Sequence, residues 1–324
     1  MLAVYADRFA PDDPLSALVV GERPSPQVPE GWAAVRIRAA ALNHHDLWTL
    51  RGVGIKAEAL PMVLGCDGAG VDEDGNEVVV HAVIGDPGVA DDETLDPDRA
   101  ILSERHWGTF AETVVVPRRN LVPKPPSLSF EEAACLPSAW LTAYRMLFTQ
   151  GGCRPGQTVL VQGAGGGVST ALVMLASAAG LRVLVTSRDE AKRERALEIG
   201  AHEAYPSGER LPVKVDAVME TVGRATWSHS VRSLRPGGVI VVSGTTSGAQ
   251  PDDAELTRIF YRQLRVVGST MGTRNELAAL VQMLDATGVR PLVDRVLPMR
   301  EARAGFEAMA GGDLFGKVVF TLHD

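Results

Sequence analysis

The spacing of hydrophobic positions changes about a third of the way along the chain. Up to about residue 120, apolar residues form short runs at 33–38, 77–82 and 112–116, separated by turns that contain Pro or Gly. Short runs between such turns predict β-strands. We therefore expect a first module that is mainly β and barrel-like, with an irregular acidic loop at residues 86–98.

Further along, strands and helices alternate. Buried strands are predicted at 158–162 and 182–187, and each is followed by a helix, at 169–179 and 189–199, that ends at a glycine. We expect further strands at 216–219, 239–242 and 264–268, and a helix at 275–286. Strand, helix, strand at this spacing predicts a doubly wound parallel sheet.

A proline-rich junction separates the two patterns. Pro123, Pro125 and Pro126 precede a predicted helix start at Ser129. After the second pattern, apolar segments at 291–298 and 317–322 are expected to return to the first module. The predicted division is residues 1–122, 123–270 and 271–324, with the first and last parts forming one discontinuous module.

Composition and charge exclude some classes of protein. The chain has 324 residues, 45% hydrophobic and 22% charged, and a net charge of -8. An acidic chain is poorly suited to bind nucleic acid or anionic membranes. Residues 155–181 carry no charge, but their glycines indicate a strand, a turn and a helix rather than a membrane span.

Cysteine usage favours a reducing compartment. Cys66, Cys135 and Cys153 are odd in number and form no CxxC pair. Neither a disulfide framework nor a structural zinc site is therefore indicated, and no secretory signal is recognisable at the N-terminus. We expect a cytoplasmic protein.

The strongest chemical signal is a glycine loop between a predicted strand and a helix. It comprises Gly163, Ala164, Gly165, Gly166, Gly167 and Val168. Glycines let the backbone approach a pyrophosphate, and the helix start offers free N–H groups. Ser169 replaces the last glycine of the usual fingerprint, which crowds the helix against the strand but leaves the loop intact. The pattern predicts a dinucleotide site.

The end of the next strand indicates which dinucleotide binds. NAD enzymes place an acid there for the ribose 2′-hydroxyl, whereas this chain has Ser187 and Arg188. A hydroxyl and a guanidinium would instead bind a 2′-phosphate. Lys192 either adds a cation to the 2′-phosphate pocket or is a solvated surface residue. The nearby Asp189 carboxylate leaves open a mixed preference for NADPH and NADH. We expect NADPH.

Several short motifs match one known family. They are found at residues 41–47, 64–71, 108–112, 136–144, 235–238 and 316–319, in addition to the glycine loop. Together they cover nearly the whole chain, which resembles the medium-chain dehydrogenases, and within them the zeta-crystallin-like quinone oxidoreductases. The resemblance implies an α/β protein, with a discontinuous GroES-like β-barrel catalytic domain and a Rossmann dinucleotide-binding domain. It also implies a homodimer, joined through the edge strand at 264–268.

The resemblance further implies that the catalytic zinc of the alcohol dehydrogenases is missing. Asn43, Cys66 and Ser138 stand where those enzymes have ligands, and only the thiol is a good one. The region that normally holds a structural zinc, residues 86–105, contains no cysteine. Adjacent His44 and His45 diverge on most backbones, so we expect no metal role for them. We expect one of them to line the active-site cleft or touch the cofactor, and the other to pack in the interior.

Candidate site residues follow from the resemblance. Asn43, with His44 or Asp46, is expected near the substrate oxygen, while Thr142 and Gly244 are expected near the nicotinamide and Lys317 in the cofactor site. Asp46 has an alternative role as a cap for a helix that begins at residue 47. Trp48 is either a cleft aromatic or a core residue.

Without a metal, hydride transfer to a quinone or an α,β-unsaturated carbonyl is favoured over simple alcohol oxidation. In these substrates the developing charge spreads to an oxygen that hydrogen-bond donors can hold. Alternatives are an enoyl-thioester reductase, a zinc-free alcohol dehydrogenase-like activity, and a non-catalytic NADPH-binding sensor or structural protein. The expected partner is a small-molecule substrate.

Overall fold

The computed structural model describes residues 1–86, 88–89 and 91–322, which form two compact units. The first comprises Met1–Leu141 and Met271–Asp324, and the second comprises Thr142–Thr270. The first boundary differs from the expected one at residue 122, because α2 (Phe130–Ala134) packs on strands of the first unit. Part of the acidic loop expected at 86–98 lies outside the described residues.

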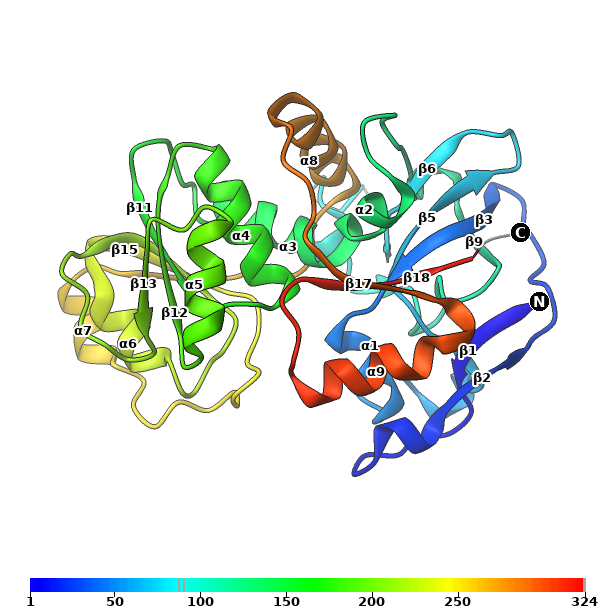
Figure 1. The fold of residues 1–324 in the computed structure, drawn as a ribbon, viewed down its shortest axis with the longest axis horizontal. Helices are drawn as coiled ribbons and strands as arrows, with labels where there is room; N and C mark the ends of the chain where they lie inside the picture. Colours follow the sequence, from blue (N-terminus) through cyan, green and yellow to red (C-terminus); the bar gives the residue numbers. More distant parts are fainter. Residues whose placement is uncertain (87, 90, 323–324) are drawn as a thin grey trace. The chain divides into compact units, whose positions relative to one another are not determined.

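The first unit is mainly β, as the hydrophobic pattern predicts (Figure 1). Its strands are β1 (Leu2–Ala6), β2 (Leu18–Glu22), β3 (Trp32–Ala41), β4 (Met62–Val63), β5 (Asp67–Asp72), β6 (Glu77–Val80), β7 (Val83–Ile84), β8 (Ala100–Ile101), β9 (Thr113–Pro117), β10 (Leu121–Pro123), β17 (Val293–Pro298) and β18 (Lys317–Thr321). Its helices are η1 (Pro14–Ala17), α1 (His44–Leu50), η2 (Ala57–Ala59), η3 (Glu93–Leu95), η4 (Arg118–Asn120), α2, η5 (Leu136–Trp140), α8 (Arg274–Thr287), η7 (Met299–Glu301) and α9 (Ala302–Gly311).

The C-terminal strands complete the sheet of the first unit. The strand order is β10-β6-β5-β3-β18-β17, and β9 also pairs with β3. β18 lies antiparallel to β3, with Val319 opposite Ala41. The expected return of the tail to the first module is therefore confirmed.

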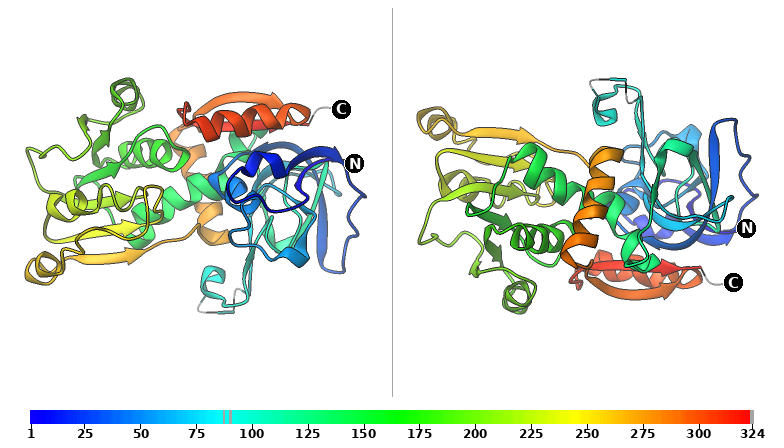
Figure 2. Two further views of the ribbon diagram at one scale, coloured as in Figure 1. Left: turned by 90° about the horizontal axis from the view of Figure 1, so that it is seen from below. Right: turned by 90° about the horizontal axis from the view of Figure 1, so that it is seen from above.

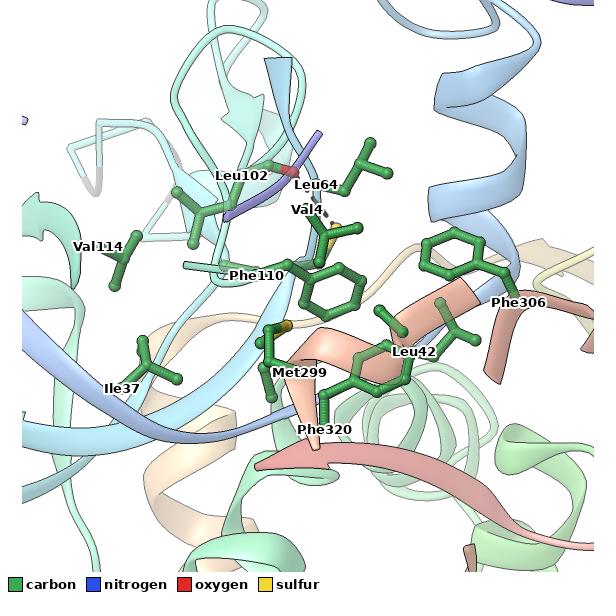
Figure 3. Packing of buried hydrophobic residues seen from close by; sticks show 14 of the residues in the cluster. Val4, Ile37, Leu42, Leu64, Leu102, Phe110, Val114, Met299, Phe306 and Phe320 are labelled. Atoms are coloured by element: carbon green, nitrogen blue, oxygen red, sulfur yellow. Dashed lines mark hydrogen bonds between the residues drawn. The ribbon is translucent and has the colours of Figure 1, made fainter. Parts of the chain in front are cut away.

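Aromatic side chains from distant segments meet in the core of this unit (Figure 3). The Phe110 and Phe320 rings lie edge to face with centroids 5.2 Å apart, and Phe306 stacks on Phe320 at 6.2 Å. Such pairs add to the stability that apolar burial provides. Phe306 comes from α9, which lies along β17 in Figure 2 and which the sequence analysis did not predict.

The second unit is a six-stranded parallel sheet flanked by helices (Figure 1). Its strands are β11 (Thr158–Gln162), β12 (Arg182–Ser187), β13 (Glu203–Pro206), β14 (Val215–Glu220), β15 (Leu234–Val242) and β16 (Arg265–Gly268). Its helices are η6 (Arg145–Gln150), α4 (Gly167–Ala178), α5 (Glu190–Glu198), α6 (Trp227–Ser233) and α7 (Leu256–Tyr261), and α3 (Leu141–Tyr144) joins the two units.

The strand order of this sheet is β13-β12-β11-β14-β15-β16. The chain adds strands in one direction from β11 and later in the other direction from β14, so the order reverses between these two strands. Right-handed crossovers then place α4 and α6 on opposite faces. The carboxyl end of β11 lies at the reversal, where doubly wound folds bind dinucleotides. The predicted doubly wound sheet is confirmed.

Among the described residues, no helix combines the length and the apolar character that crossing a membrane requires.

Candidate active site

The glycine loop joins the end of β11 to the start of α4. Gly163 and Gly165 have φ angles of +82° and +94°, which other residues rarely adopt. Gly166 is the N-cap of α4, and the Ser169 hydroxyl donates a hydrogen bond to the Gly166 carbonyl at 3.0 Å. The first turn of α4, with Gly167 and Val168, leaves backbone N–H groups without helical partners. This geometry suits an anion such as a pyrophosphate.

A buried polar network supports the strand ends around this loop. The Gln162 amide nitrogen donates a hydrogen bond to the Ser230 hydroxyl at 2.9 Å, and the amide oxygen accepts one from the Thr186 hydroxyl at 2.5 Å. The Glu220 carboxylate, which is fully buried, accepts from the backbone N–H groups of Val222 and Gly223. The Ser230 hydroxyl also donates to Glu220, so the network links β11, β12, β14 and α6 beside the glycine loop. These residues were not predicted from the sequence, where Gln162, Thr186 and Glu220 stand out only as polar residues at the ends of apolar strands.

The residues expected at the 2′-phosphate lie together at the end of β12. Ser187 is buried, and Arg188 is exposed beside it. The Asp189 carboxylate accepts from the Lys192 backbone N–H at 3.0 Å and so caps α5. The Arg193 guanidinium donates to the Ser187 carbonyl at 2.9 Å, which adds a cation that the sequence analysis missed.

Thr142 and Gly244 also belong to the second unit. Thr142 is 7% exposed and lies in α3. Gly244 follows β15, and a Cβ there would come within 3.0 Å of the Thr221 carbonyl. This close approach favours a glycine at the position. Their contact with the nicotinamide stays a prediction.

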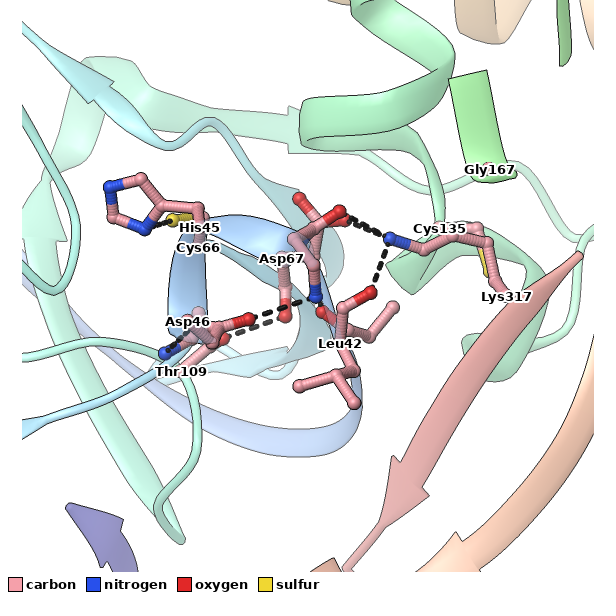
Figure 4. A network of polar contacts seen from close by, with 12 residues as sticks. Leu42, His45, Asp46, Cys66, Asp67, Thr109, Cys135, Gly167 and Lys317 are labelled. Carbon is pink, nitrogen blue, oxygen red and sulfur yellow. Dashed lines mark hydrogen bonds and ion pairs between the residues drawn. The ribbon is translucent and has the colours of Figure 1, made fainter. Parts of the chain in front are cut away.

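In the first unit, a buried lysine organises the candidate substrate site (Figure 4). The Lys317 ammonium donates to the Leu42 carbonyl at 2.9 Å, to Asn43 Oδ1 at 2.6 Å and to Asp67 Oδ2 at 3.1 Å. The side chains of Lys317 and Asp67 are 3% and 0% exposed. All three N–H groups of Lys317 therefore have protein acceptors, and the cofactor contact expected for it would compete with them.

Lys317 also determines which way the Asn43 amide points. An ammonium only donates, so the atom facing it must be the amide oxygen. The amide nitrogen then has one hydrogen bond, to the Ala41 carbonyl at 3.3 Å, and its second N–H has no partner among the described residues. Asn43 is only partly buried.

Asp46 connects two backbone segments beside this amide. One oxygen accepts from the Asn43 N–H and the other from the Gly65 N–H, both at 2.9 Å. Gly65 has a φ of +97°, and a Cβ there would clash with Phe110, so the turn requires glycine. Burial raises the pKa of Asp46 to about 6. The structure supports the capping alternative, although α1 begins at His44 with Asn43 as its N-cap.

The other residues of α1 differ in exposure. His44 is exposed, and desolvation and the Lys317 charge lower the pKa of its imidazole. Trp48 is 40% exposed, so the core alternative for this residue is wrong.

His45 packs inward, as one of the two histidines was expected to do. Its Nδ1 lies 3.2 Å from Cys66 Sγ, and its Nε2 lies 3.1 Å from Glu104 Oε1. Burial opposes a charge on His45, but Cys66 and the hydrogen bond to Glu104 outweigh it and raise the pKa of the imidazole well above its usual value. Glu104 was not predicted from the sequence, because 59 residues separate it from His45.

The residues at the zinc position of the alcohol dehydrogenases fit a tetrahedral catalytic zinc poorly. The Asn43 amide oxygen already accepts from an ammonium, Cys66 is bound to His45, and the buried Ser138 hydroxyl has no partner among the described residues. Tetrahedral catalytic zinc needs three good protein ligands. One thiol, one amide and one hydroxyl next to a buried cation do not fit it.

A second group of potential metal ligands lies close by. Ligand atoms of His45, Asp46 and Cys66 lie within 4.8 Å of one another in the part of the chain that the structure describes. However, both Asp46 oxygens are engaged by backbone N–H groups, and the two ring nitrogens of His45 face Cys66 and Glu104. A metal bound there would have to break these contacts.

Comparison with known proteins agrees with this arrangement of a barrel unit and a dinucleotide unit. Residues 29–126 match the family described as alcohol dehydrogenase GroES-like domain, and residues 167–286 match zinc-binding dehydrogenase. A zinc-type alcohol dehydrogenase-like protein of Schizosaccharomyces pombe is 31% identical, over 90% of this chain and 91% of its own. The fold and these matches define an oxidoreductase.

More distant relatives have different activities in their names. An acryloyl-coenzyme A reductase of Sulfurisphaera tokodaii is 26% identical over 92% of this chain and 94% of its own. A quinone oxidoreductase of Mus musculus is 27% identical over 89% and 88%. A crystal structure of an NAD-dependent alcohol dehydrogenase superposes with a TM-score of 0.91 at 34% identity, over the full length of both chains. The chain belongs to the medium-chain dehydrogenase/reductase superfamily.

Proposed function

We propose that this oxidoreductase is NADPH-dependent and zinc-independent, and that it reduces quinones or α,β-unsaturated carbonyls. The observation that carries the proposal is the Asn43 amide: its oxygen accepts from Lys317, and one of its N–H groups has no partner among the described residues and could donate to a substrate oxygen. In zinc-dependent relatives a metal would polarise that oxygen. Here the Asn43 position offers a neutral donor instead.

The choice of substrate follows from the strength of this donor. A single amide N–H stabilises a full alkoxide poorly, but it suffices for charge that is spread over an enolate or a hydroquinone anion. When bound, NADPH supplies the hydride, which goes to the β-carbon of an enone or to a quinone carbon. The oxygen takes up the electron pair while Asn43 donates to it, and the proton is supplied by solvent.

The preference for NADPH rests on the end of β12. Arg188 and the neighbouring Arg193 provide cations, and the Asp189 carboxylate is turned to the start of α5. A 2′-phosphate would be held by charge-assisted hydrogen bonds there. Because one similar solved structure is described as NAD-dependent, both cofactors belong in the test.

The experiment follows nicotinamide absorbance with NADPH and NADH against quinones, enones, aldehydes and alcohols, with a chelator present throughout. We expect NADPH-selective reduction of quinones or enones that survives the chelator, and less than one zinc per chain by elemental analysis. Asn43→Ala should lower kcat about 100-fold or more, whereas removal of an exposed amide elsewhere in the chain, Gln27→Ala, should leave it unchanged. Chelator-sensitive turnover of alcohols would overturn the proposal.

Reduction of an enoyl thioester is a second candidate, because a relative is an acryloyl-coenzyme A reductase. The same amide would hold the thioester oxygen while hydride adds to the β-carbon. Comparing acryloyl- and crotonyl-coenzyme A with simple enones separates the two candidates by kcat/KM. Tight NADPH binding without turnover of any acceptor would instead favour a sensor or structural role.

We further propose that the protein is a cytoplasmic homodimer. β16 is the edge strand of the parallel sheet, and apolar side chains beside it are exposed: Leu256 at 69%, Phe260 at 70% and Tyr261 at 81%. An exposed edge and apolar patch suit pairing with a second copy. Light scattering should give a dimer for the wild type and a monomer for Phe260→Asp, and a monomeric wild type would refute this.

A further inference from the structure

A cavity with basic walls lies in the second unit. Its volume is about 450 Å³, and its walls come from the segment after β13, from α6 and from α7. The charged side chains that line it are Arg210, Lys214, Arg232 and Arg258, and no Asp or Glu is among the lining residues described. Since the chain as a whole carries a net charge of -8, this concentration of cations is local.

Carboxylates neutralise only part of this charge. The Glu255 carboxylate pairs with Arg232 at 2.8 Å and with Arg258 at 3.5 Å. Neither Arg210 nor Lys214 forms an ion pair with a carboxylate among the described residues, and the Lys214 ammonium donates to the Arg232 carbonyl. Burial and then the nearby arginines, Arg262, Arg258 and Arg210, lower the pKa of Lys214. The cavity is therefore short of negative charge.

The cationic end of the cavity is separate from the dinucleotide site. Lys214 directly precedes β14, and Arg232 lies in the last turn of α6, which leads into β15. Both positions are at the amino-terminal edge of the parallel sheet. The glycine loop follows β11 at the opposite, carboxyl-terminal edge.

We propose that this cavity binds a compact anion that carries phosphate groups, at the same time as the nicotinamide cofactor. Arginine forks and a lysine ammonium are the groups that hold phosphate oxygens in proteins. Leu211 and Val213 give the cavity an apolar wall against which a small organic part of the ligand would pack. Its volume falls within the range of about 300 to 1,000 Å³ that small-molecule sites occupy.

The test is calorimetric titration of the full chain with inorganic pyrophosphate at constant ionic strength, with NADP⁺ present at saturation. The cofactor then blocks the glycine loop, so the remaining binding reports on other sites. We expect one binding event, weakened at least about 10-fold in a double variant, Arg210→Gln with Lys214→Gln, because two charge-assisted contacts are lost. The matched control removes two exposed cations elsewhere, Arg51→Gln with Arg154→Gln, and should bind normally.

Three results would overturn the proposal: no binding in the presence of NADP⁺, equal loss in the control variant, or competition between pyrophosphate and NADP⁺. The measurement involves no turnover, so it stands or falls independently of the proposed reductase activity. Unfolding curves of the double variant check that it is folded.

Discussion

The two units build their candidate sites in different ways. The candidate dinucleotide site is contiguous, because one stretch of residues 163–168 makes both the turn and the helix start. The substrate site in the barrel unit instead depends on Lys317, which lies 274 residues from Asn43 and 250 from Asp67. A contiguous site is specified by local backbone conformation, whereas a dispersed one depends on the completed sheet.

The largest expected effect tests this dependence. Lys317→Met leaves the Asp67 carboxylate buried without its cation and should lower the free energy of unfolding by about 3 to 5 kcal/mol. The double variant with Asp67→Asn removes the stranded charge and should recover part of the loss. Urea unfolding measures both. A loss of less than about 1 kcal/mol in the single variant would contradict a tight buried pair.

A substitution in the glycine loop should weaken cofactor binding without unfolding the first unit. Gly165→Val forces a β-branched residue to a φ of +94° and should weaken NADPH binding about 100-fold or more. Gly152→Val is the matched control, since Gly152 also has a positive φ, is exposed and has no atoms near its Cβ position. Fluorescence titration with NADPH compares them, and equal weakening in both would argue against a specific role for the loop.

A smaller effect is expected at the 2′-phosphate end. Arg188→Gln should weaken NADPH binding about 10-fold, the value of one charge-assisted contact, and leave NADH binding unchanged. Ser187→Asp should shift the preference toward NADH, because a carboxylate binds the ribose hydroxyl and repels the phosphate. Fluorescence titrations of each variant with NADPH and with NADH measure both affinities. Parallel losses for NADPH and NADH would mean that Arg188 contacts another part of the cofactor.

The smallest expected effect concerns long-range contacts in the second unit. Asp216 accepts from the Thr158 N–H at 2.8 Å and from Arg235 at 2.7 Å. Burial works against the charged form, but these hydrogen bonds outweigh it and lower the pKa of Asp216. Asp216→Asn should therefore cost about 1 kcal/mol at neutral pH.

The sign of the pH dependence follows from the lowered pKa of Asp216. The stabilisation is fully present above the unfolded pKa of about 3.9 and is lost as the pH falls through the lower folded pKa. The difference from wild type should therefore shrink in acid. Asp252→Asn, at an exposed pair with Arg224, is the control and should change stability by less than about 0.5 kcal/mol.

Much of the fold was predictable from local patterns. The strands at 158–162 and 182–187 have the predicted bounds, because each has three consecutive β-branched or leucine residues at its centre and follows a turn that contains glycine. The helices α6, α7 and α9 were missed. α6 and α7 are short, and their polar and apolar residues give little periodicity.

By itself, the sequence determined the parts of this protein that depend on neighbouring residues: the glycine turn, the alternation of strands and helices, and the cations after β12. Only the tertiary structure decided that Lys317 orients the Asn43 amide, that Asp46 bonds Gly65, and that Cys66 and Glu104 enclose His45. These contacts join segments brought together by the pairing of β18 with β3 and by the turn before β5. No local propensity encodes such distances, because each contact forms only when the sheet is complete.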